Sequence, residues 1–237
     1  MPEIPDSLLP TILFQDDSLV CIHKPAGLLT IPDGYDPGAP HVAQLMAAEF
    51  GKLWIVHRLD RETSGVVILA RSAAAHRALN RQFEQRSVQK VYQALVAGQP
   101  AWDAAILDLP LRVNGDRKHR TVVSALIGKP ANTDFKVLQR LRSACQIEAR
   151  PHTGYTHQIR AHLAAIGCPI LGDALYTRAS FSPLLPPGAS PLPEIPIHRV
   201  ALHALSITFQ HPFTAAILQI EDPLPPDMQQ AIVELSH

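Results

Sequence analysis

The stretch from His57 to Gly65 holds the side chains best suited to chemistry. It reads HRLDRETSG and runs directly into the apolar residues 66–70 (VVILA). A polar loop that leads into a buried strand is a common place for reactive groups. Asp60 stands out, since a carboxylate can act as a covalent catalyst when an opposite charge keeps it ionised. The plain alternative is a solvated turn before a strand.

Seven of these nine positions match the signature H-R-L-D-x-x-T-S-G, and on this ground the chain resembles the RluA-type pseudouridine synthases. An accidental match over seven positions has a chance of roughly one in a billion at each starting point. Members of this family modify RNA. The resemblance implies that Asp60 is the nucleophile.

Four further segments resemble the motifs of the same family in the same order, so the likeness covers about residues 12–212. Residues 23–28 (HKPAGL) are similar to N-K-P-x-G-L, and residues 90–92 (KVY) are similar to K-x-Y. Residues 152–173 resemble T-G-R-x-H-Q-I-R-x-H-L followed by P-x-x-G-D, and residues 199–212 resemble R-L-x-L-H-A followed by H-P. The shared order and spacing of the segments are stronger evidence for the resemblance than any one segment alone.

The reaction that this resemblance implies converts a uridine within RNA to pseudouridine. The N-glycosidic bond breaks, the uracil turns and a carbon–carbon glycosidic bond forms, so a carboxylate can serve as catalyst and no cofactor is required. The resemblance places Arg160 beside Asp60 in an ion pair and Tyr92 against the flipped base, where its hydroxyl can help to move the C5 proton. Arg58 would fill the gap that the uridine leaves, and Ile159 would be an apolar floor for the uracil.

The remaining basic candidates are assigned to RNA phosphates. Each role has an ordinary alternative, because a strand tyrosine or a helical isoleucine is more often part of the core and a single arginine often lies on a solvated surface. The phosphate candidates are Lys24, Lys90, Arg117, Lys118 and Arg120.

Two positions depart from the family pattern. Tyr155 stands where the family usually has a basic residue, which puts one expected backbone contact with RNA in doubt and offers a stacking surface instead. Cys168 stands where the family often has histidine, and we interpret this as a packing change.

The net charge of zero conceals a strong asymmetry along the 237 residues. Residues 1–57 carry two basic and seven acidic side chains, residues 58–178 carry eighteen and nine, and residues 179–237 carry one and five. Fifteen of the 21 basic residues are arginine, whose planar guanidinium suits phosphates and stacks on bases. The central basic block therefore predicts a surface that faces RNA.

Other classes of site find little support. The three cysteines are far apart and lack C-x-x-C spacing, and the histidine pairs five residues apart do not share one helix face, so we expect neither disulfide nor metal. No apolar run reaches the roughly 18 residues of a membrane span, and the first residues do not resemble a secretory signal. We expect a cytoplasmic protein that does not bind membranes.

Hydrophobic periodicity predicts short strands interspersed with helices. The expected strands are 12–14, 19–22, 66–70, 88–96, 109–113, 121–126, 135–141, 145–149, 199–209 and 215–220. The expected helices are 41–50, 72–86, 156–167 and 227–235, with Ser72 and Thr156 as N-caps of the second and third. This mixture indicates an α+β protein. The resemblance implies the pseudouridine synthase fold, a long, largely antiparallel mixed β-sheet with flanking helices and loops and a central active-site cleft.

We expect residues 1–237 to form a single catalytic domain, with residues 177–198 as a proline-rich loop or insertion. No segment before residue 12 resembles the small RNA-binding domain of several relatives, so the layout is closest to single-domain members. The expected partner is a stem-loop of ribosomal or transfer RNA, bound by a monomer.

Two other functions were weighed. A non-catalytic RNA-binding module would need positive charge and stacking, but it would not need an aspartate among phosphates. A glycoside hydrolase would need a pair of carboxylates, for which Glu62 is the nearest partner of Asp60 in sequence, although the signature tolerates variation there.

Overall fold

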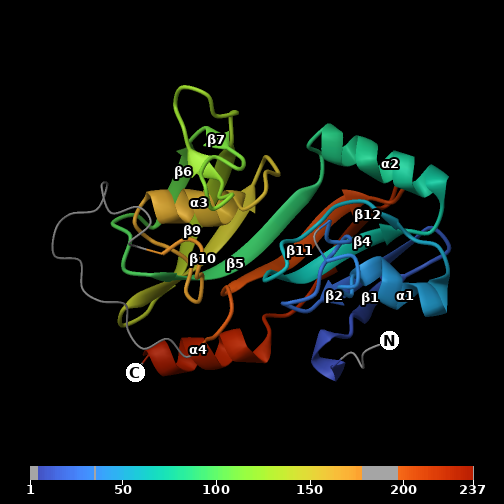
Figure 1. Ribbon diagram of the computed structural model, residues 1–237, viewed down its shortest axis with the longest axis horizontal. Coiled ribbons are helices and arrows are strands. Elements are labelled where there is room, and N and C mark those ends of the chain that lie inside the picture. Colours follow the sequence, from blue (N-terminus) through green and yellow to red (C-terminus); the bar gives the residue numbers. More distant parts are fainter. Residues whose placement is uncertain (1–4, 35, 178–196, 237) are drawn as a thin grey trace. The chain divides into compact units, whose positions relative to one another are not determined.

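The computed structural model describes residues 5–34, 36–177 and 197–236, so most of the expected proline-rich stretch 177–198 lies outside the described residues. The chain forms two compact units (Figure 1). Unit 1 contains Met1–Lys90 and Ala204–Pro223, and unit 2 contains Val91–His203 and Leu224–His237. Each unit is therefore built from two stretches that are distant in sequence. The expectation of a single domain stays a prediction.

Unit 1 is a sheet that carries two helices. Its strands follow the order β1, β2, β4, β11, with β3 paired to β4 and β12 paired to β11. The elements are β1 (Thr11–Gln15), β2 (Leu19–Lys24), β3 (Trp54–Ile55), β4 (Ser64–Ala70), β11 (Leu202–Gln210), β12 (Ile217–Glu221), the 3₁₀ turn η1 (Asp6–Leu8), α1 (Val42–Phe50) and α2 (Ala73–Glu84).

Strand β4 is the centre of unit 1 because every one of its seven residues is buried. Its apolar run packs with Leu19 and Cys21 of β2, with Leu79 of α2 and with Phe209 of β11. The hydroxyl of Ser72 accepts a hydrogen bond from the backbone N–H of Ala75 and begins α2 as expected. The signature loop thus enters a strand that cannot shift without disturbing the core.

Unit 2 contains a four-stranded run in the order β5, β10, β9, β6 and a separate two-stranded sheet of β7 and β8. Helix α3 packs against β10 and β8, and the core also takes in Met228, Ala231 and Leu235 of α4. The elements are β5 (Gln89–Ala97), β6 (Ala104–Asp108), β7 (Leu111–Arg112), β8 (Val122–Val123), β9 (Asn132–Arg140), β10 (Ala144–Pro151), α3 (Gln158–Ala165) and α4 (Pro226–Ser236).

The α+β class and the largely antiparallel pairing are confirmed, and every strand pair whose register is described is antiparallel. Several details differ from expectation. Strands β3 and β6 were not predicted, β7 and β8 are shorter than the expected strands 109–113 and 121–126, and α3 begins at Gln158 rather than at Thr156. His157 is its N-cap, with φ 57° and no side-chain capping bond. Of the helices in the described part of the chain, none has both the length and the apolarity to span a bilayer.

Candidate active site

Asp60 lies half-buried in unit 1, in the loop that leads into β4. Its backbone carbonyl accepts a hydrogen bond from the N–H of Thr63 at 3.0 Å, which closes a tight turn. Thr63 and Ser64, the next polar residues of the signature, are buried at the start of the strand, whereas Arg58 is exposed. The turn therefore holds the Asp60 backbone, while both arginines of the stretch, Arg58 and Arg61, are exposed.

Hydrogen bonds from residues 24–30 hold this loop in place. The backbone N–H of Gly27 donates to the carbonyl of Arg61 at 2.8 Å, and Arg61 Nε donates to the carbonyl of Gly27 at 3.0 Å. Thr30 Oγ1 lies 3.2 Å from the N–H of Leu59 and 2.9 Å from its carbonyl oxygen. The residues on both sides of Asp60 are thus fixed through their backbone groups.

Lys24 has a different role from the one expected. Its side chain is completely buried, and its ammonium donates to the carbonyl oxygens of Pro25, Leu28 and Arg61 at 2.9, 2.8 and 3.1 Å. A buried ammonium is stable only when such acceptors replace its water. In this position Lys24 holds the Asp60 loop and does not face a phosphate, which corrects the sequence-based assignment.

His57, the first residue of the signature, is a neutral acceptor. Its Nε2 accepts a hydrogen bond from the N–H of Ile68 at 3.0 Å, so a proton on the ring must sit on Nδ1. The ring stacks on Phe83 of α2, with centroids 5.0 Å apart. Burial first, and then the nearby charge of Lys90, lower the pKa of His57 to about 3. Burial also lowers the pKa of Lys90, the predicted phosphate ligand whose charge acts on His57, to about 8.

This environment predicts acid sensitivity. In the unfolded chain His57 takes up a proton near its ordinary pKa of 6.5, whereas the folded protein does so only near 3. The unfolded state binds the extra proton between these values, so the free energy of unfolding should fall as the pH is lowered through this window. His57→Gln, whose amide oxygen can accept the bond from Ile68, should lose less stability in acid. Urea unfolding at neutral pH and at about pH 4.5 measures the difference.

His152→Gln is the matched control, because it changes an exposed histidine of unit 2. It should keep the acid response of the unchanged protein. Equal acid sensitivity in both variants would contradict the assignment to His57.

The other predicted groups of the site belong to unit 2. Tyr92 lies on β5 opposite Ala149 of β10 and packs, partly buried, against the main core. Ile159 is 5% exposed and is a member of that core, so the chain uses it at least for packing. Asp60 lies in unit 1, while Tyr92, Ile159 and Arg160 lie in unit 2, so their meeting remains a prediction.

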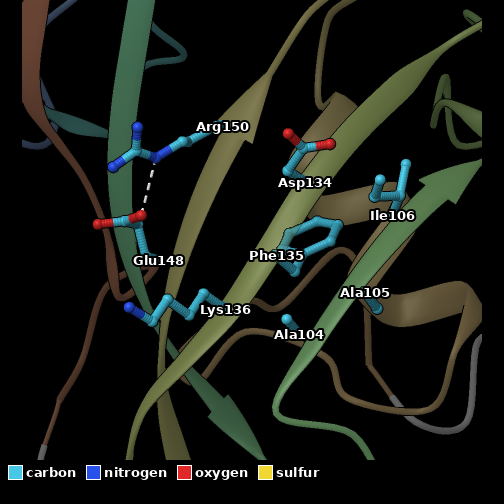
Figure 2. A pocket seen from close by; sticks show the side chains of 8 residues that line it. All are labelled: Ala104, Ala105, Ile106, Asp134, Phe135, Lys136, Glu148 and Arg150. Carbon is cyan, nitrogen blue, oxygen red and sulfur yellow. Dashed lines mark hydrogen bonds and ion pairs between the residues drawn. The ribbon is translucent and has the colours of Figure 1, made fainter.

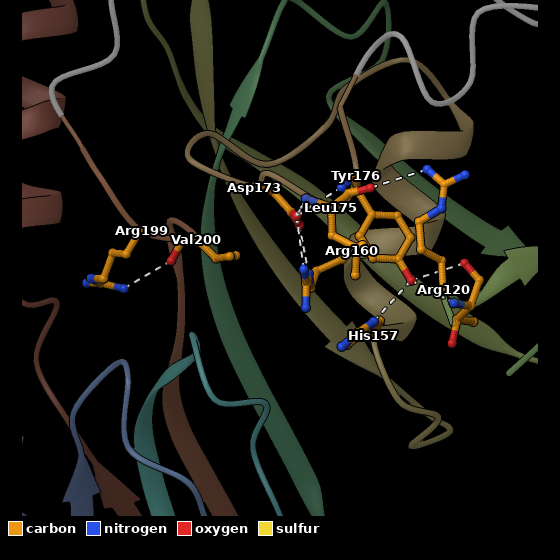
Figure 3. A network of polar contacts seen from close by, with 9 residues as sticks. Arg120, His157, Arg160, Asp173, Leu175, Tyr176, Arg199 and Val200 are labelled. Atoms are coloured by element: carbon orange, nitrogen blue, oxygen red, sulfur yellow. Dashed lines mark hydrogen bonds and ion pairs between the residues drawn. The ribbon is translucent and has the colours of Figure 1, made fainter. Parts of the chain in front are cut away.

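Arg160 sits in the first turn of α3 and is only 6% exposed. Its Nε and Nη2 donate to the two carboxylate oxygens of Asp173 at 2.7 and 2.9 Å (Figure 3). The guanidinium also lies over the ring of Tyr176, 5.0 Å from the ring centroid. Arg160 is therefore a buried and oriented cation, not an ordinary surface arginine.

The turn before α3 is held by one buried amide. Gln158 Nε2 donates to the carbonyl of Asn132 and to Thr133 Oγ1, while its Oε1 accepts from Thr153 Oγ1 and from the N–H of Tyr155. These bonds fix the register of the helix two residues before Arg160. Polar anchoring replaces the Thr156 cap that the sequence predicted.

The basic hairpin is present, although its strands are shorter than expected. Leu111 and Arg112 pair with Val123 and Val122. Asp116 organises the tip, because its carboxylate accepts hydrogen bonds from the N–H groups of Lys118 and Arg120 at 3.0 Å each. Arg117 and Lys118 are exposed there and suit contact with phosphates.

Arg120 departs from its expected role in phosphate binding. Its Nε donates to Asp116 Oδ2 at 2.6 Å, and its Nη1 donates to the carbonyl of Leu175 at 3.3 Å. The side chain is only 14% exposed. Arg120 therefore ties the hairpin to the segment that follows Asp173, which corrects the sequence-based assignment.

Comparison with known proteins now decides the family. Residues 18–165 match the sequence model of the family described as RNA pseudouridylate synthase, and this range includes the Asp60 loop, Tyr92 and Arg160. The chain belongs to this family. Relatives confirm the RluA-type assignment: the chain is 36% identical over 202 residues to the dual-specificity RNA pseudouridine synthase RluA of Escherichia coli, covering 85% of the chain and 87% of the relative.

A second relative of this pseudouridylate synthase is the ribosomal large subunit pseudouridine synthase D of Nitrosomonas europaea. It is 39% identical over 237 residues, and the match covers 95% of this chain but 66% of the relative. Among solved structures, human RNA pseudouridylate synthase domain containing 4 gives a TM-score of 0.74 at 27% identity, covering 95% of this chain and 92% of that one. Human RNA pseudouridylate synthase domain containing 1 gives 0.75 at 23% identity, with 97% and 90% covered, which shows the shared fold alone.

The two departures from the family pattern both serve packing in this pseudouridylate synthase. Tyr155 is half-buried and packs beside Leu175 and Val123 against the small core formed by α3 and the hairpin. Cys168 is 6% exposed and belongs to the main core of unit 2. Among the described residues, no group of three or more histidine, cysteine, aspartate or glutamate side chains is arranged to hold a metal.

Unit 2 also carries a surface groove lined by residues of β6, β9 and β10. Figure 2 shows the side chains that line it. The groove has a volume of about 470 Å³, and none of the predicted site residues lines it. Its four charged side chains, Asp134, Lys136, Glu148 and Arg150, face one another in cross-strand register and balance in charge. Such pairs stabilise a sheet face, and they do not favour a polyanion.

Proposed function

We propose that the protein converts a specific uridine in structured RNA, ribosomal or transfer, to pseudouridine by covalent catalysis through Asp60. The observation that supports this most is the rigid support of Asp60 within the matched family segment. Lys24, Gly27 and Thr30 hold the backbone on both sides of Asp60 through groups that do not depend on its carboxylate. A nucleophile gains rate from being fixed in position before the substrate arrives.

In the proposed reaction the uridine leaves the stack and the Asp60 carboxylate forms a covalent bond to the nucleotide. The bond between N1 and the sugar breaks, the uracil rotates, C5 bonds to the sugar in place of N1, and the bond to Asp60 breaks, which restores the free carboxylate. The proton that leaves C5 is balanced by the one that N1 takes up, so no cofactor is consumed. Tyr92 offers a ring for the base and a hydroxyl for the C5 proton.

Arg160 is the proposed counter-ion of Asp60, since a nearby cation favours the ionised carboxylate that must attack. Arg58, which is exposed next to the nucleophile loop, would fill the space of the flipped base. Ile159 would border the uracil. Lys90 and the hairpin residues Arg117 and Lys118 would contact phosphates.

We also propose that the enzyme works as a monomer in the cytoplasm. The two relatives with 36% and 39% identity come from bacteria, in which ribosomal and transfer RNA lie in that compartment. The word dual-specificity in the name of one relative supports testing more than one RNA class.

The direct test uses unmodified transcripts of transfer RNA and of large-subunit ribosomal RNA, each made with uridine tritiated at C5. Pseudouridine formation releases that tritium to water. We expect release from at least one transcript, and a pseudouridine missing at the same position in RNA from cells that lack the gene. No release from either transcript, together with unchanged cellular pseudouridines, would refute the proposal.

RNA binding should weaken with salt, because the contacts proposed for the hairpin are to phosphates. The double change Arg117→Ala with Lys118→Ala should lower affinity and reduce the slope of log affinity against log salt by about 1.5 for single-stranded contacts. Lys136→Ala with Arg150→Ala removes the same two residue types from the groove of unit 2 and should leave the slope unchanged. Filter binding across a salt series measures both, and equal slopes would contradict the hairpin assignment.

A further inference from the structure

The pair of Arg160 and Asp173 is an unusual use of two charges in a protein interior. The side chain of Asp173 is 0% exposed and that of Arg160 is 7% exposed. Asp173 Oδ1 also accepts from the N–H groups of Leu175 and Tyr176 at 3.0 Å each. Burying two charges costs free energy that apolar residues would not cost, so such a pair is weak as a source of stability. The geometry of the pair indicates that Asp173 orients the guanidinium of Arg160.

The contacts fix the guanidinium in two independent ways. Two parallel hydrogen bonds to one carboxylate set the plane and the direction of the Nε–Nη2 edge. The Tyr176 ring lies against the face of the group. Rotation about the last side-chain bonds of Arg160 would break at least one of these contacts.

Tyr176 extends the arrangement to the basic hairpin. It is fully buried, and its hydroxyl accepts from the N–H of Thr121 at 2.8 Å and donates to the carbonyl of Thr121 at 3.2 Å. His157 Nδ1 lies 3.2 Å from the same oxygen and must be the donor there, because the one hydroxyl proton is already used. Burial raises the pKa of Tyr176 to about 12, so the hydroxyl keeps that proton.

Thr121 directly follows Arg120 at the end of the hairpin tip, and its Oγ1 donates to the carbonyl of Thr156 at 2.6 Å. Figure 3 shows Arg160 bonded to Asp173 and lying near Tyr176, the bond between Tyr176 and His157, and the bond of Arg120 to the carbonyl of Leu175. The segment of Asp173 and Tyr176 therefore joins the hairpin that carries Arg117 and Lys118 to the predicted counter-ion.

We propose that Asp173 and Tyr176 are positioning residues for Arg160. Asp173 sets the orientation in which Arg160 pairs with Asp60, and Tyr176 couples that orientation to the hairpin through Thr121. This inference rests on the proposed function, because it assumes that Arg160 acts on the nucleophile. Asp173, the aspartate of the P-x-x-G-D segment, would thus contribute to catalysis by orienting Arg160.

Asp173→Asn is the main test. Asparagine keeps the shape but turns an N–H₂ group or a single neutral oxygen toward the guanidinium, so the bidentate bond is lost. A shift of about 1 Å in a catalytic group can lower the rate about 100-fold. We expect kcat for tritium release to fall about 100-fold while KM for the RNA transcript stays within about twofold.

Asp227→Asn is the matched control. Asp227 holds Arg199 of the same unit by the same bidentate geometry, at 2.6 and 2.8 Å, but on a more exposed surface. Its loss should leave kcat and KM unchanged. A merely structural role for Asp173 would instead lower the thermal midpoint without changing kcat per folded molecule.

Tyr176→Phe separates the two tasks of the tyrosine. The ring stays against Arg160, so kcat should fall by less than about threefold, while the lost bonds to Thr121 loosen the hairpin and raise KM about fivefold. If Asp173→Asn does not fold, this variant decides, and normal kcat and KM would overturn the proposal.

The two levels of failure are distinguishable. An unchanged protein that releases no tritium from either transcript contradicts the proposed function. An active protein whose Asp173→Asn variant keeps kcat within twofold of Asp227→Asn contradicts the positioning role alone.

Discussion

Replacement of Asp60 by asparagine is expected to abolish pseudouridine formation and to leave the fold intact. The carboxylate is the only nucleophile in the proposed reaction, and loss of a covalent catalyst lowers kcat by at least about 10⁴-fold. The loop keeps its shape because Thr63, Lys24 and Thr30 hold it through backbone carbonyls and N–H groups. Asparagine at position 60 leaves each of those bonds in place.

The measurement is tritium release under single-turnover conditions, together with RNA affinity and the thermal midpoint of the variant. Affinity should change little, because the phosphate contacts lie elsewhere. Glu62→Gln is the control, since it removes the neighbouring exposed carboxylate and should leave kcat within about twofold. A large loss in both variants would favour a mechanism with two carboxylates, and turnover by Asp60→Asn would refute the nucleophile.

The local parts of this fold were predictable because their signals are local. The apolar run of residues 66–70 predicts a buried strand, and Ser72 predicts the start of α2. The exact start of α3 was not predictable, since it depends on Gln158 reaching Asn132 and Thr133 from another strand. Strand β6 escaped prediction for the same reason, because it is defined by its pairing with β9.

In the candidate site, too, features with a local sequence signal were predictable, and features set by contacts between distant residues were not. The signature points to Asp60 as the candidate nucleophile. The sequence could not reveal that Lys24 is buried and donates hydrogen bonds to three carbonyl oxygens, because a lysine is normally exposed. Arg120 likewise looks like its neighbours Arg117 and Lys118 until Asp116 and the carbonyl of Leu175 are seen to hold it. Charge and motif locate the groups, whereas contacts over long sequence distances decide which of them face the RNA.

The glycine that ends the signature is expected to be required for stability, not for chemistry. Gly65 has φ +124°, and a Cβ built on it would lie 2.4 Å from the carbonyl oxygen of Ala204 in β11, the strand next to β4. Gly65→Ala therefore combines an unfavourable backbone conformation with a clash against backbone that cannot move alone. Each of these effects costs about 1–3 kcal/mol, so the free energy of unfolding should fall by about 2–6 kcal/mol.

Gly51→Ala isolates the first effect, because Gly51 has φ +65° but no atom within 4 Å of the built Cβ. It should cost about 1 kcal/mol, and Gly34→Ala, with neither constraint, should be close to neutral. Urea unfolding of the three variants measures the costs, and a Gly65→Ala cost no larger than that of Gly51→Ala would contradict the clash. Activity per folded molecule should persist in Gly65→Ala, since the glycine packs the Asp60 strand against the strand of the R-L-x-L-H-A segment. Gly65 and Ala204 belong to two motifs that are 139 positions apart in the sequence. Their backbones are in close contact, so a side chain at position 65 would push the strands of the two motifs apart.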